Sequence, residues 1–234
     1  MNVSVVIPAL DEEEPIGDVV RACLATNLAN EVVVVDNGSS DQTAERARAA
    51  GARVVTAKRG YGRACAAGVR AISSQTEVIV FLDGDGSDCP EMMDRLLEPI
   101  AQDLADFVIG SRTRGEREVG SMNFQQVFAG RFAGWLLGLL YGVKYTDMCP
   151  FRAIRYDALQ RLGMREETYG WNLEMQMRAA QAGLRIIEVP VNHRCRAGGK
   201  SKVSGNLPTT LVAGARIFAT LLRVATGARK SKVV

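Results

Sequence analysis

The sequence predicts a single α/β domain with a mostly parallel, doubly wound sheet and helices on both faces. Three observations support this prediction. Short apolar runs alternate with helical patterns through the first half of the 234-residue chain. Runs such as EVVVVD at 31–36 and EVIVFL at 77–82 are apolar at nearly every position, which is typical of parallel strands covered on both faces. Hydrophobic residues make up 47% of the chain, enough to bury a sizeable core without disulfides.

The first half is expected to alternate strands with helices. The strands are expected at Val3–Pro8, Glu31–Asp36, Arg53–Ala57, Glu77–Leu82 and Asp106–Gly110. The helices are expected at Glu13–Ala25, Asp41–Ala50, Gly62–Ile72 and Pro90–Ala101. This alternation is typical of βαβ units, whose ligands bind beyond the carboxyl ends of the strands. Segments 8–11, 36–40 and 83–88 are therefore expected to face the binding site.

The second half is less regular. Residues 113–124 form a charged loop, and residues 127–143 are the most apolar stretch, interrupted by Arg131 and four glycines. At this length a buried or interfacial helix is favoured over a membrane span. A helix at Gly170–Gly183, a strand at Ile186–Pro190, a loop at Arg194–Asn206 and an amphipathic helix at Leu207–Gly227 complete the prediction.

Charge is distributed unevenly along the chain. Residues 189–234 carry nine Lys or Arg side chains and no Asp or Glu, so the rest of the chain is net negative. Such a tail suits phosphate groups or a membrane surface, or is simply a solvated basic end. Nucleic acid is not expected, because Phe218 is the only aromatic residue of the tail.

The cysteines and the N-terminus indicate the compartment. The five cysteines are far apart, odd in number and without a CxxC pair, which indicates reduced thiols. The N-terminal residues MNVSVVIPAL enter a strand pattern at once and lack the basic segment of a signal peptide. A cytoplasmic protein is expected.

Asp83 and Asp85 are the strongest candidates for chemistry. They flank Gly84 on a turn that leaves the predicted strand at 77–82, so both carboxylates can face one cleft. Hard divalent ions prefer such oxygen ligands and commonly bridge to substrate phosphates. The alternative is a solvated turn, because DGDG is turn-rich composition. The position at a strand end favours the metal interpretation.

Other candidates are weaker. Asp36 ends the second strand and can accept hydrogen bonds from a base or a ribose. The glycines at 60, 62 and 68 only partly match a phosphate loop, since Cys65 stands where GxGxxG has its third glycine. His193, the only histidine, is either a surface residue or an additional metal ligand.

Two further acidic residues each have two possible roles. Glu174 lies in a helical pattern with apolar neighbours, and is either a buried general base or the partner of an arginine. Asp147 follows the apolar stretch, and either orients a substrate or forms a salt bridge with Arg152.

Seven segments occur in one order along most of the chain. They are VVIPALDEEEPI, VVVVDNGSSDQT, GYGRACAAG, VIVFLDGDGSDCPE, VIGSR, TDMCPFRAI and GGKSKVSG. Together they resemble glycosyltransferase family 2, and within it the polyprenyl-phosphate (dolichyl-phosphate) mannose or glucose synthases. The resemblance implies a GT-A fold, a Rossmann-like nucleotide-sugar domain, at residues 1–206. Residues 207–234 would be a basic amphipathic helix and tail, in the same domain or at the membrane interface.

The resemblance also implies site residues. Those matching the nucleotide-sugar site are Pro8, Asp11, Glu12, Asp36, Gly62, Asp83 and Asp85. Asp83 and Asp85 match the DxD motif that holds Mg²⁺ or Mn²⁺ with the donor diphosphate. Ser87 stands where relatives often carry a glutamine ligand, so Ser87 or Asp88 is left as the further metal ligand. Asn37 replaces the second acid of the usual pair, and TDMCPFRAI has Met-Cys-Pro where Thr-Ser-Gly is common.

The expected activity follows from this resemblance. An inverting transferase would move a hexose from UDP- or GDP-hexose to a polyprenyl phosphate at the cytoplasmic membrane face. The catalytic candidates are Asp85, Arg112, Arg131, Asp147 and Glu174. The candidates for the acceptor phosphate are Arg131, Arg152, Arg194, Ser201 and Lys202. An acceptor that is already a phosphate anion needs no strong base.

Two alternatives remain open at this point. A hydroxyl acceptor would require Glu174 or Asp147 as a general base. An inactive nucleotide- or membrane-binding module is disfavoured by the intact pair Asp83 and Asp85. The apolar stretch at 127–143 could pack in a homodimer as readily as lie on a membrane, and peripheral attachment is expected.

Overall fold

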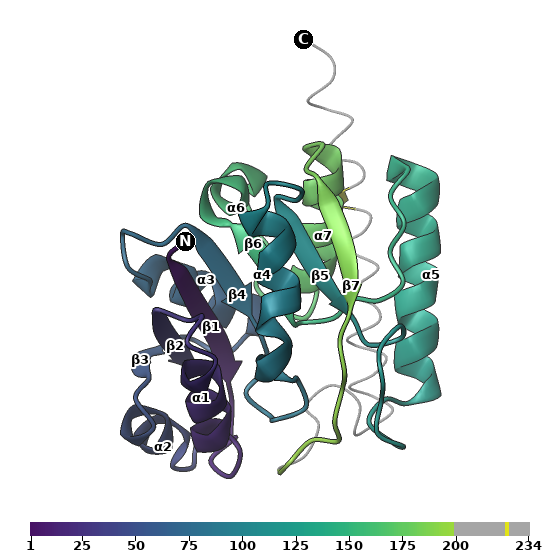
Figure 1. Ribbon diagram of the computed structural model, residues 1–234. Coiled ribbons are helices and arrows are strands. Elements are labelled where there is room, and N and C mark those ends of the chain that lie inside the picture. Colours follow the sequence, from purple (N-terminus) through teal and green to yellow (C-terminus); the bar gives the residue numbers. More distant parts are fainter. Residues whose placement is uncertain (199–222, 225–234) are drawn as a thin grey trace.

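The computed structural model describes residues 1–198 together with residues 223 and 224. Seven strands form one sheet in the order β3-β2-β1-β4-β6-β5-β7 (Figure 1). The strands are β1 Val3–Ala9, β2 Glu31–Asp36, β3 Arg53–Thr56, β4 Val78–Phe81, β5 Phe107–Ser111, β6 Arg152–Arg155 and β7 Ile186–Pro190. Of these, β6 runs antiparallel to both its neighbours, β4 and β5.

Seven α-helices accompany the sheet in the described part of the chain. They are α1 Ile16–Ala25, α2 Thr43–Ala49, α3 Tyr61–Ala71, α4 Met93–Ala101, α5 Phe124–Tyr141, α6 Tyr156–Leu162 and α7 Trp171–Gln181. A 3₁₀ turn at Pro90–Met92 precedes α4. Helices α1 and α4 lie over the face of the sheet nearest the viewer in Figure 1, and α3 lies behind it. Helix α5 stands beyond β7, at the opposite side of the molecule from β3.

Burial follows the strand order. Strand β1 is buried at all seven positions and β4 at all four, because helices cover both faces of the central strands. Strand β3, at the edge, has exposed residues at both ends. The burial of the central strands agrees with the apolar runs of the sequence. The loops that follow β1, β2 and β4 are therefore anchored in the packed core.

The predicted fold class is confirmed, and two elements were missed. Strand β6 and helix α6 follow one another at residues 152–162, a segment without a continuous apolar run. Strand β6 begins with Arg152 and ends with Arg155, and these charged residues hide the strand pattern. The predicted helix at Leu207–Gly227 and the boundary at residue 206 lie outside the described residues and stay predictions.

Helix α5 is longer at its start than predicted and packs closely at its middle. It covers Phe124–Tyr141, where residues 127–143 had been expected. A Cβ on Gly134 would lie 1.9 Å from the carbonyl oxygen of Tyr145, so only glycine lets the returning chain run against the helix at this point. Among the described residues, no helix combines the length and the hydropathy that crossing a membrane requires.

Candidate active site

Acidic side chains gather where the central strands end. Asp83 and Asp85 follow β4, Glu12 follows β1, and Asp36 is the last residue of β2. Strand β1 pairs in parallel with both β2 and β4, so these ends meet at one edge of the sheet, the lower edge in Figure 1. The segments expected to face the binding site therefore lie together at the carboxyl edge of the parallel strands, where ligands bind in such sheets.

Three carboxylates are held close together after β4. Asp83 accepts a hydrogen bond from the Tyr61 hydroxyl at 3.0 Å, and Asp88 accepts one from the backbone N–H of Asp83 at 3.0 Å. Asp85 accepts two hydrogen bonds from Ser87, from its N–H at 2.9 Å and from its hydroxyl at 2.6 Å. In this arrangement Ser87 orients Asp85, and Asp88 is tied to the turn that carries Asp83.

Burial and mutual repulsion change the pKa values of two of these acids, Asp83 and Asp88. Burial, followed by the charges of Asp88 and Asp85, raises the pKa of Asp83 well above its usual range. Burial also raises the pKa of Asp88, and the charge of Asp85 adds to the effect. Asp83 and Asp88 are thus neighbouring carboxylates with raised pKa values, which is a common property of functional sites.

His193 lies in this site and not on the surface. Its side chain is buried, and its Nδ1 lies 3.9 Å from Asp88 Oδ1. Neither of these two buried atoms has a hydrogen-bond partner among the described residues. Burial, and then the charge of Arg112, lowers the pKa of His193 to about 4, so the imidazole is neutral at neutral pH.

These observations fit a hard divalent cation. The acids supply oxygen ligands, and a bound cation would relieve their repulsion and satisfy the unpaired Asp88 oxygen. Within the described ranges no group of three or more His, Cys, Asp or Glu side chains is placed to hold a metal ion. A cation here would thus rely on few protein carboxylates, with Asp83 and Asp85 as the first candidates, and on substrate phosphate oxygens and water, the manner in which Mg²⁺ usually binds.

Arg196 supplies positive charge that the sequence interpretation did not assign. Its Nη1 lies 2.7 Å from both carboxylate oxygens of Glu12, and its Nη2 lies 3.0 Å from Asp85 Oδ2. In the sequence it was counted only as one charge of the basic tail. Its separation from Glu12 by 184 positions explains why no local pattern could reveal the contact.

Arg112 and Asp147 form a second buried unit beside the carboxylates. Arg112 donates from Nε at 2.8 Å and from Nη2 at 2.9 Å to the two oxygens of Asp147. Burial by itself would raise the pKa of Asp147, but the charge and hydrogen bonds of Arg112 hold it below its usual range. Asp147 is therefore ionised and engaged by Arg112. The predicted salt bridge to Arg152 is wrong, because Arg112 takes that place.

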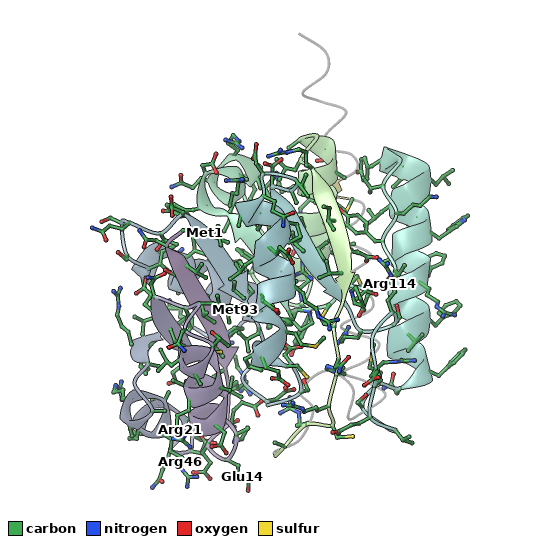
Figure 2. All side chains as sticks on the ribbon, in the orientation of Figure 1. Met1, Glu14, Arg21, Arg46, Met93 and Arg114 are labelled. Carbon is green, nitrogen blue, oxygen red and sulfur yellow. The ribbon has the colours of Figure 1, made fainter. Side chains whose placement is uncertain are left out.

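A pocket of about 670 Å³ opens next to this pair. Thr113 and Thr146, the neighbours of Arg112 and Asp147, line its inner side. The basic residues Arg114, Arg131 and Lys144 and the apolar side chains Trp135, Leu139 and Val143 complete much of the wall. Figure 2 shows Arg114 between β7 and α5. The pocket combines cationic and apolar surface, so it suits a ligand with an anionic head and an apolar body.

The predicted nucleotide-side residues lie around the loop after β1. Pro8 is buried in β1 opposite Val35. Asp11 accepts hydrogen bonds from the Ser40 N–H at 2.8 Å and hydroxyl at 3.1 Å, which ties the loops after β1 and β2 together. Asp36 is half-buried and accepts one from the Ser39 N–H at 3.1 Å. Their contacts with a nucleotide stay predictions.

Two predicted site residues have packing roles. A Cβ on Gly62 would lie 2.1 Å from the carbonyl oxygen of Glu166, so this glycine allows a close approach of two backbones. The Arg152 side chain is completely buried and donates to the carbonyl oxygens of Cys149 at 2.9 Å and Asn172 at 3.1 Å. The complete burial of Arg152 corrects its assignment to the acceptor phosphate, whereas the assignment of Gly62 to the nucleotide sugar stays a prediction.

Glu174 is also a structural residue. It is fully buried on α7, pairs with Arg178 at 2.9 Å, and accepts hydrogen bonds from the backbone N–H groups of Arg165 and Glu166. Of the two interpretations of Glu174, the structure supports the one in which it is the partner of an arginine. The assignment of Glu174 as a general base is corrected. Its carboxylate holds the 165–166 segment, which packs against Gly62.

The remaining residues predicted to bind the acceptor phosphate lie in different parts of the chain. Arg131 is exposed on α5 and lines the pocket. Arg194 is half-exposed and forms an ion pair with Glu91. Ser201 and Lys202 lie outside the described residues. All five cysteines are free thiols, as the sequence predicted.

Similarity to known proteins agrees with this geometry. The chain is 37% identical over 218 residues to an uncharacterized glycosyltransferase of Mycobacterium tuberculosis, covering 90% of this chain and 94% of the relative. It is 34% identical over 224 residues to the undecaprenyl-phosphate mannosyltransferase of Micrococcus luteus, covering 88% and 89% of the two chains.

The fold is also found among solved structures. Glucosyl-3-phosphoglycerate synthase from Mycobacterium tuberculosis, in complex with Mn²⁺, uridine diphosphate and phosphoglyceric acid, superposes with a TM-score of 0.75 at 25% identity. The match covers 96% of this chain and 78% of that one. The family model for glycosyl transferase family 2 matches residues 4–163, which span the sheet edge with its carboxylates and the Arg112–Asp147 pair. The chain belongs to glycosyl transferase family 2.

Proposed function

We propose that this protein transfers a hexose, with inversion, from a nucleotide-diphosphate sugar to a polyprenyl phosphate at the cytoplasmic face of a membrane. The observation that carries the proposal is the adjacency of two sites. The acidic cluster after β4 suits a cation with a diphosphate, and the pocket beside Arg112 and Asp147 suits an anionic amphiphile. The named activity of the Micrococcus luteus relative supports the same acceptor class.

On the donor side, the loops after β1, β2 and β4 would hold the nucleotide sugar. Asp83, Asp85 and Asp88 would hold Mg²⁺ or Mn²⁺, which, when bound, supplies positive charge to the leaving nucleoside diphosphate. Asp36 would contact the base or the ribose. Ser87 keeps Asp85 in one orientation through its two hydrogen bonds.

On the acceptor side, cationic residues would position the phosphate. Arg131 and Arg114 line the pocket, and Arg112 directly precedes the lining residue Thr113. Held there, the acceptor phosphate would be near the anomeric carbon of the donor, and proximity and electrostatic stabilisation would provide the rate enhancement. Asp147 fixes the Arg112 guanidinium through its paired hydrogen bonds, so Asp147 positions and does not contact the acceptor.

The state of the acids favours a phosphate over a hydroxyl acceptor. A hydroxyl group requires a base, and the two carboxylates expected for that task, Asp147 and Glu174, are both engaged by arginines. A phosphate oxygen is already anionic at neutral pH and attacks without losing a proton to the protein. These observations therefore favour a phosphate acceptor over a hydroxyl acceptor.

Helix α5 would face the membrane. Phe124, Phe128, Phe132 and Trp135 form a stacked series along it, and all four are exposed. Aromatic side chains with nearby cations are typical of helices that lie in the headgroup region of a bilayer. Because Trp135 also lines the pocket, a lipid phosphate could enter the pocket directly from the bilayer.

A lipid-product assay tests the proposal. Labelled UDP- and GDP-hexoses would be incubated with the full chain, undecaprenyl phosphate and Mn²⁺, and organic-phase label would be measured. We expect a lipid-linked sugar from at least one donor, and a loss of roughly a hundredfold or more in Asp85→Asn. Asp94→Asn, a change of the same kind at an exposed position of α4, should keep full activity. No lipid-linked product from any donor would refute the proposal.

A further inference from the structure

Arg196 occupies the place that a bound cation would take beside Asp85. One guanidinium nitrogen contacts both oxygens of Glu12 at 2.7 Å, and the other contacts Asp85 Oδ2 at 3.0 Å. Glu12 and Asp85 are nearly buried, and Arg196 is about one quarter exposed. The guanidinium therefore joins the loop after β1 to the loop after β4 across the proposed cation site.

The segment that carries Arg196 is fastened to the same turn by its backbone. We call residues 193–198 the strap. Within it, His193 forms a β-bridge with Asp88, the Arg194 N–H donates to Ser87 O at 2.9 Å, and the Ala197 N–H donates to Asp85 O at 3.0 Å. The strap thus lies along residues 85–88 and holds the Arg196 side chain over Asp85.

A divalent ion and a guanidinium compete for the same carboxylate. An ion bound at Asp85 would stand within a few ångströms of the Arg196 charge, and like charges that close in a partly buried site repel strongly. In addition, Arg196 already neutralises part of the negative charge that would attract the ion. Both effects weaken binding of the ion in the absence of substrate.

We propose that Arg196 is a positioning residue that acts as an internal cation: it holds Asp85 and Glu12 together and must leave Asp85 when a divalent ion binds. The inference rests on the proposed cation site. It makes ion and donor binding mutually dependent, because the diphosphate brings the negative charge that lets two cations share the site. A reciprocal coupling of this kind strengthens each ligand's binding by the same factor.

Metal binding measured without turnover tests this inference. Mn²⁺ would be titrated by calorimetry and by the loss of its free-ion EPR signal, using the full chain with and without UDP or GDP. We expect Arg196→Gln to bind Mn²⁺ alone about tenfold more tightly than the wild type, which equals about 1.4 kcal/mol. The gain in Mn²⁺ affinity on adding the nucleotide should shrink in this variant.

The matched control is Arg194→Gln. Arg194 lies in the same strap, but its ion pair is with Glu91, so removing its charge should change Mn²⁺ affinity by less than about twofold. Arg196→Lys provides a second variant in case the glutamine destabilises the fold. An ammonium keeps the charge but does not bridge Glu12 and Asp85 as a planar guanidinium does, so intermediate Mn²⁺ affinity is expected.

Each outcome decides the inference. Equal Mn²⁺ affinity in the wild type and a folded Arg196→Gln variant would overturn it, and so would a failure of that variant to bind Mn²⁺ at all. Failure of the proposed function is separate: tighter Mn²⁺ binding in Arg196→Gln without any lipid-linked product would leave the role of Arg196 intact and refute only the acceptor assignment.

Discussion

At the residue scale, the site is organised by unbalanced charge. Asp88 is buried and Asp83 is partly buried, and neither forms an ion pair with a Lys or Arg among the described residues, whereas Asp147 pairs directly with Arg112. The two groups lie side by side, and the first has raised pKa values while the second has a lowered one. This division is what a site needs when one part must accept a cation and the other must remain a fixed anion–cation unit.

The buried acids predict how stability depends on pH without metal. Burial above all raises the pKa of Asp83 to about 8 and that of Asp88 to about 7, so the folded protein keeps protons that the unfolded chain has lost. Between pH 4 and 6.5 the lowered pKa of His193 opposes this effect. From pH 6.5 to 8 the carboxylates dominate, and the free energy of unfolding should fall by on the order of 1 kcal/mol per pH unit.

Urea unfolding in EDTA at pH 6.5, 7.2 and 8 measures this slope. The titratable and charged groups near the two acids are Asp85, Arg112, Asp147, Tyr61, His193, Cys23, Cys65 and Cys149. The variant Asp88→Asn removes one titrating group and its repulsion of Asp83, so its stability should depend less on pH over this window. Saturating Mn²⁺ should also reduce the slope. A stability that rises between pH 6.5 and 8 would contradict the assignment.

The same residues show what the sequence could predict. Asp83 and Asp85 were identifiable because they follow an apolar strand directly, and strand ends carry ligands in such sheets. Arg196 was not, and the two interpretations of His193 could not be separated, because each residue meets its partner across more than a hundred positions of the chain. Arg152 was misassigned for a related reason: charge in the sequence suggests exposure, but this guanidinium is buried against backbone carbonyls.

At the element scale, parallel strands were predictable and the antiparallel one was not. Strands β1, β2 and β4 are covered on both faces, so they appear as continuous apolar runs. Strand β6 lies in the middle of the sheet, yet it begins and ends with arginine. Its place depends on long-range pairing with β4 and β5, which no local pattern encodes.

Helix α5 allows a direct test of its packing. A Cβ on Gly134 would lie 1.9 Å from a backbone carbonyl oxygen, so Gly134→Ala must displace the 145–146 segment or the helix. We expect this variant to lose about 1–3 kcal/mol of unfolding free energy. Gly130→Ala, on the same helix, would meet Asp147 Oδ1 at an ordinary 3.5 Å and should be neutral or gain up to about 1 kcal/mol from helix propensity.

Chemical denaturation followed by circular dichroism distinguishes the two substitutions. The comparison is matched, because both replace an interior glycine of α5 by alanine. Equal stability of the two variants would mean that α5 does not pack against residues 145–147 as described. Because Thr146 lines the pocket and Asp147 holds Arg112, a shift here should also weaken the acceptor side of the site.

At the scale of the whole molecule, the two proposed substrates approach from different sides. The donor would bind at the carboxyl edge of the sheet, whereas α5 stands beyond β7 (Figure 1). The aromatic side chains of α5 are exposed. The pocket and the Arg112–Asp147 pair lie between the carboxyl edge and α5. This arrangement lets a water-soluble nucleotide sugar and a membrane-held lipid phosphate meet without either crossing the other's path.

Vesicle binding tests this orientation. Phe128 and Phe132 are 60% and 52% exposed on α5, and burying an aromatic side chain in a bilayer contributes about 1.5–3 kcal/mol. The double variant Phe128→Ser with Phe132→Ser should therefore partition onto phosphatidylglycerol vesicles at least about tenfold more weakly. Leu104→Ser, which alters a 58% exposed side chain away from α5, should bind as the wild type does.

Tryptophan fluorescence reports the same event from the native chain. Of the two tryptophans, Trp171 is 3% exposed and insensitive to new surroundings, whereas Trp135 is 62% exposed within the aromatic series. Vesicles should therefore shift the emission to shorter wavelength through Trp135, and Trp135→Tyr should abolish the shift. If the wild type neither co-sediments with vesicles nor shows this shift, α5 does not face a bilayer. Its exposed aromatic series would then have to be covered by a second copy of the chain, which sedimentation equilibrium would reveal as a dimer.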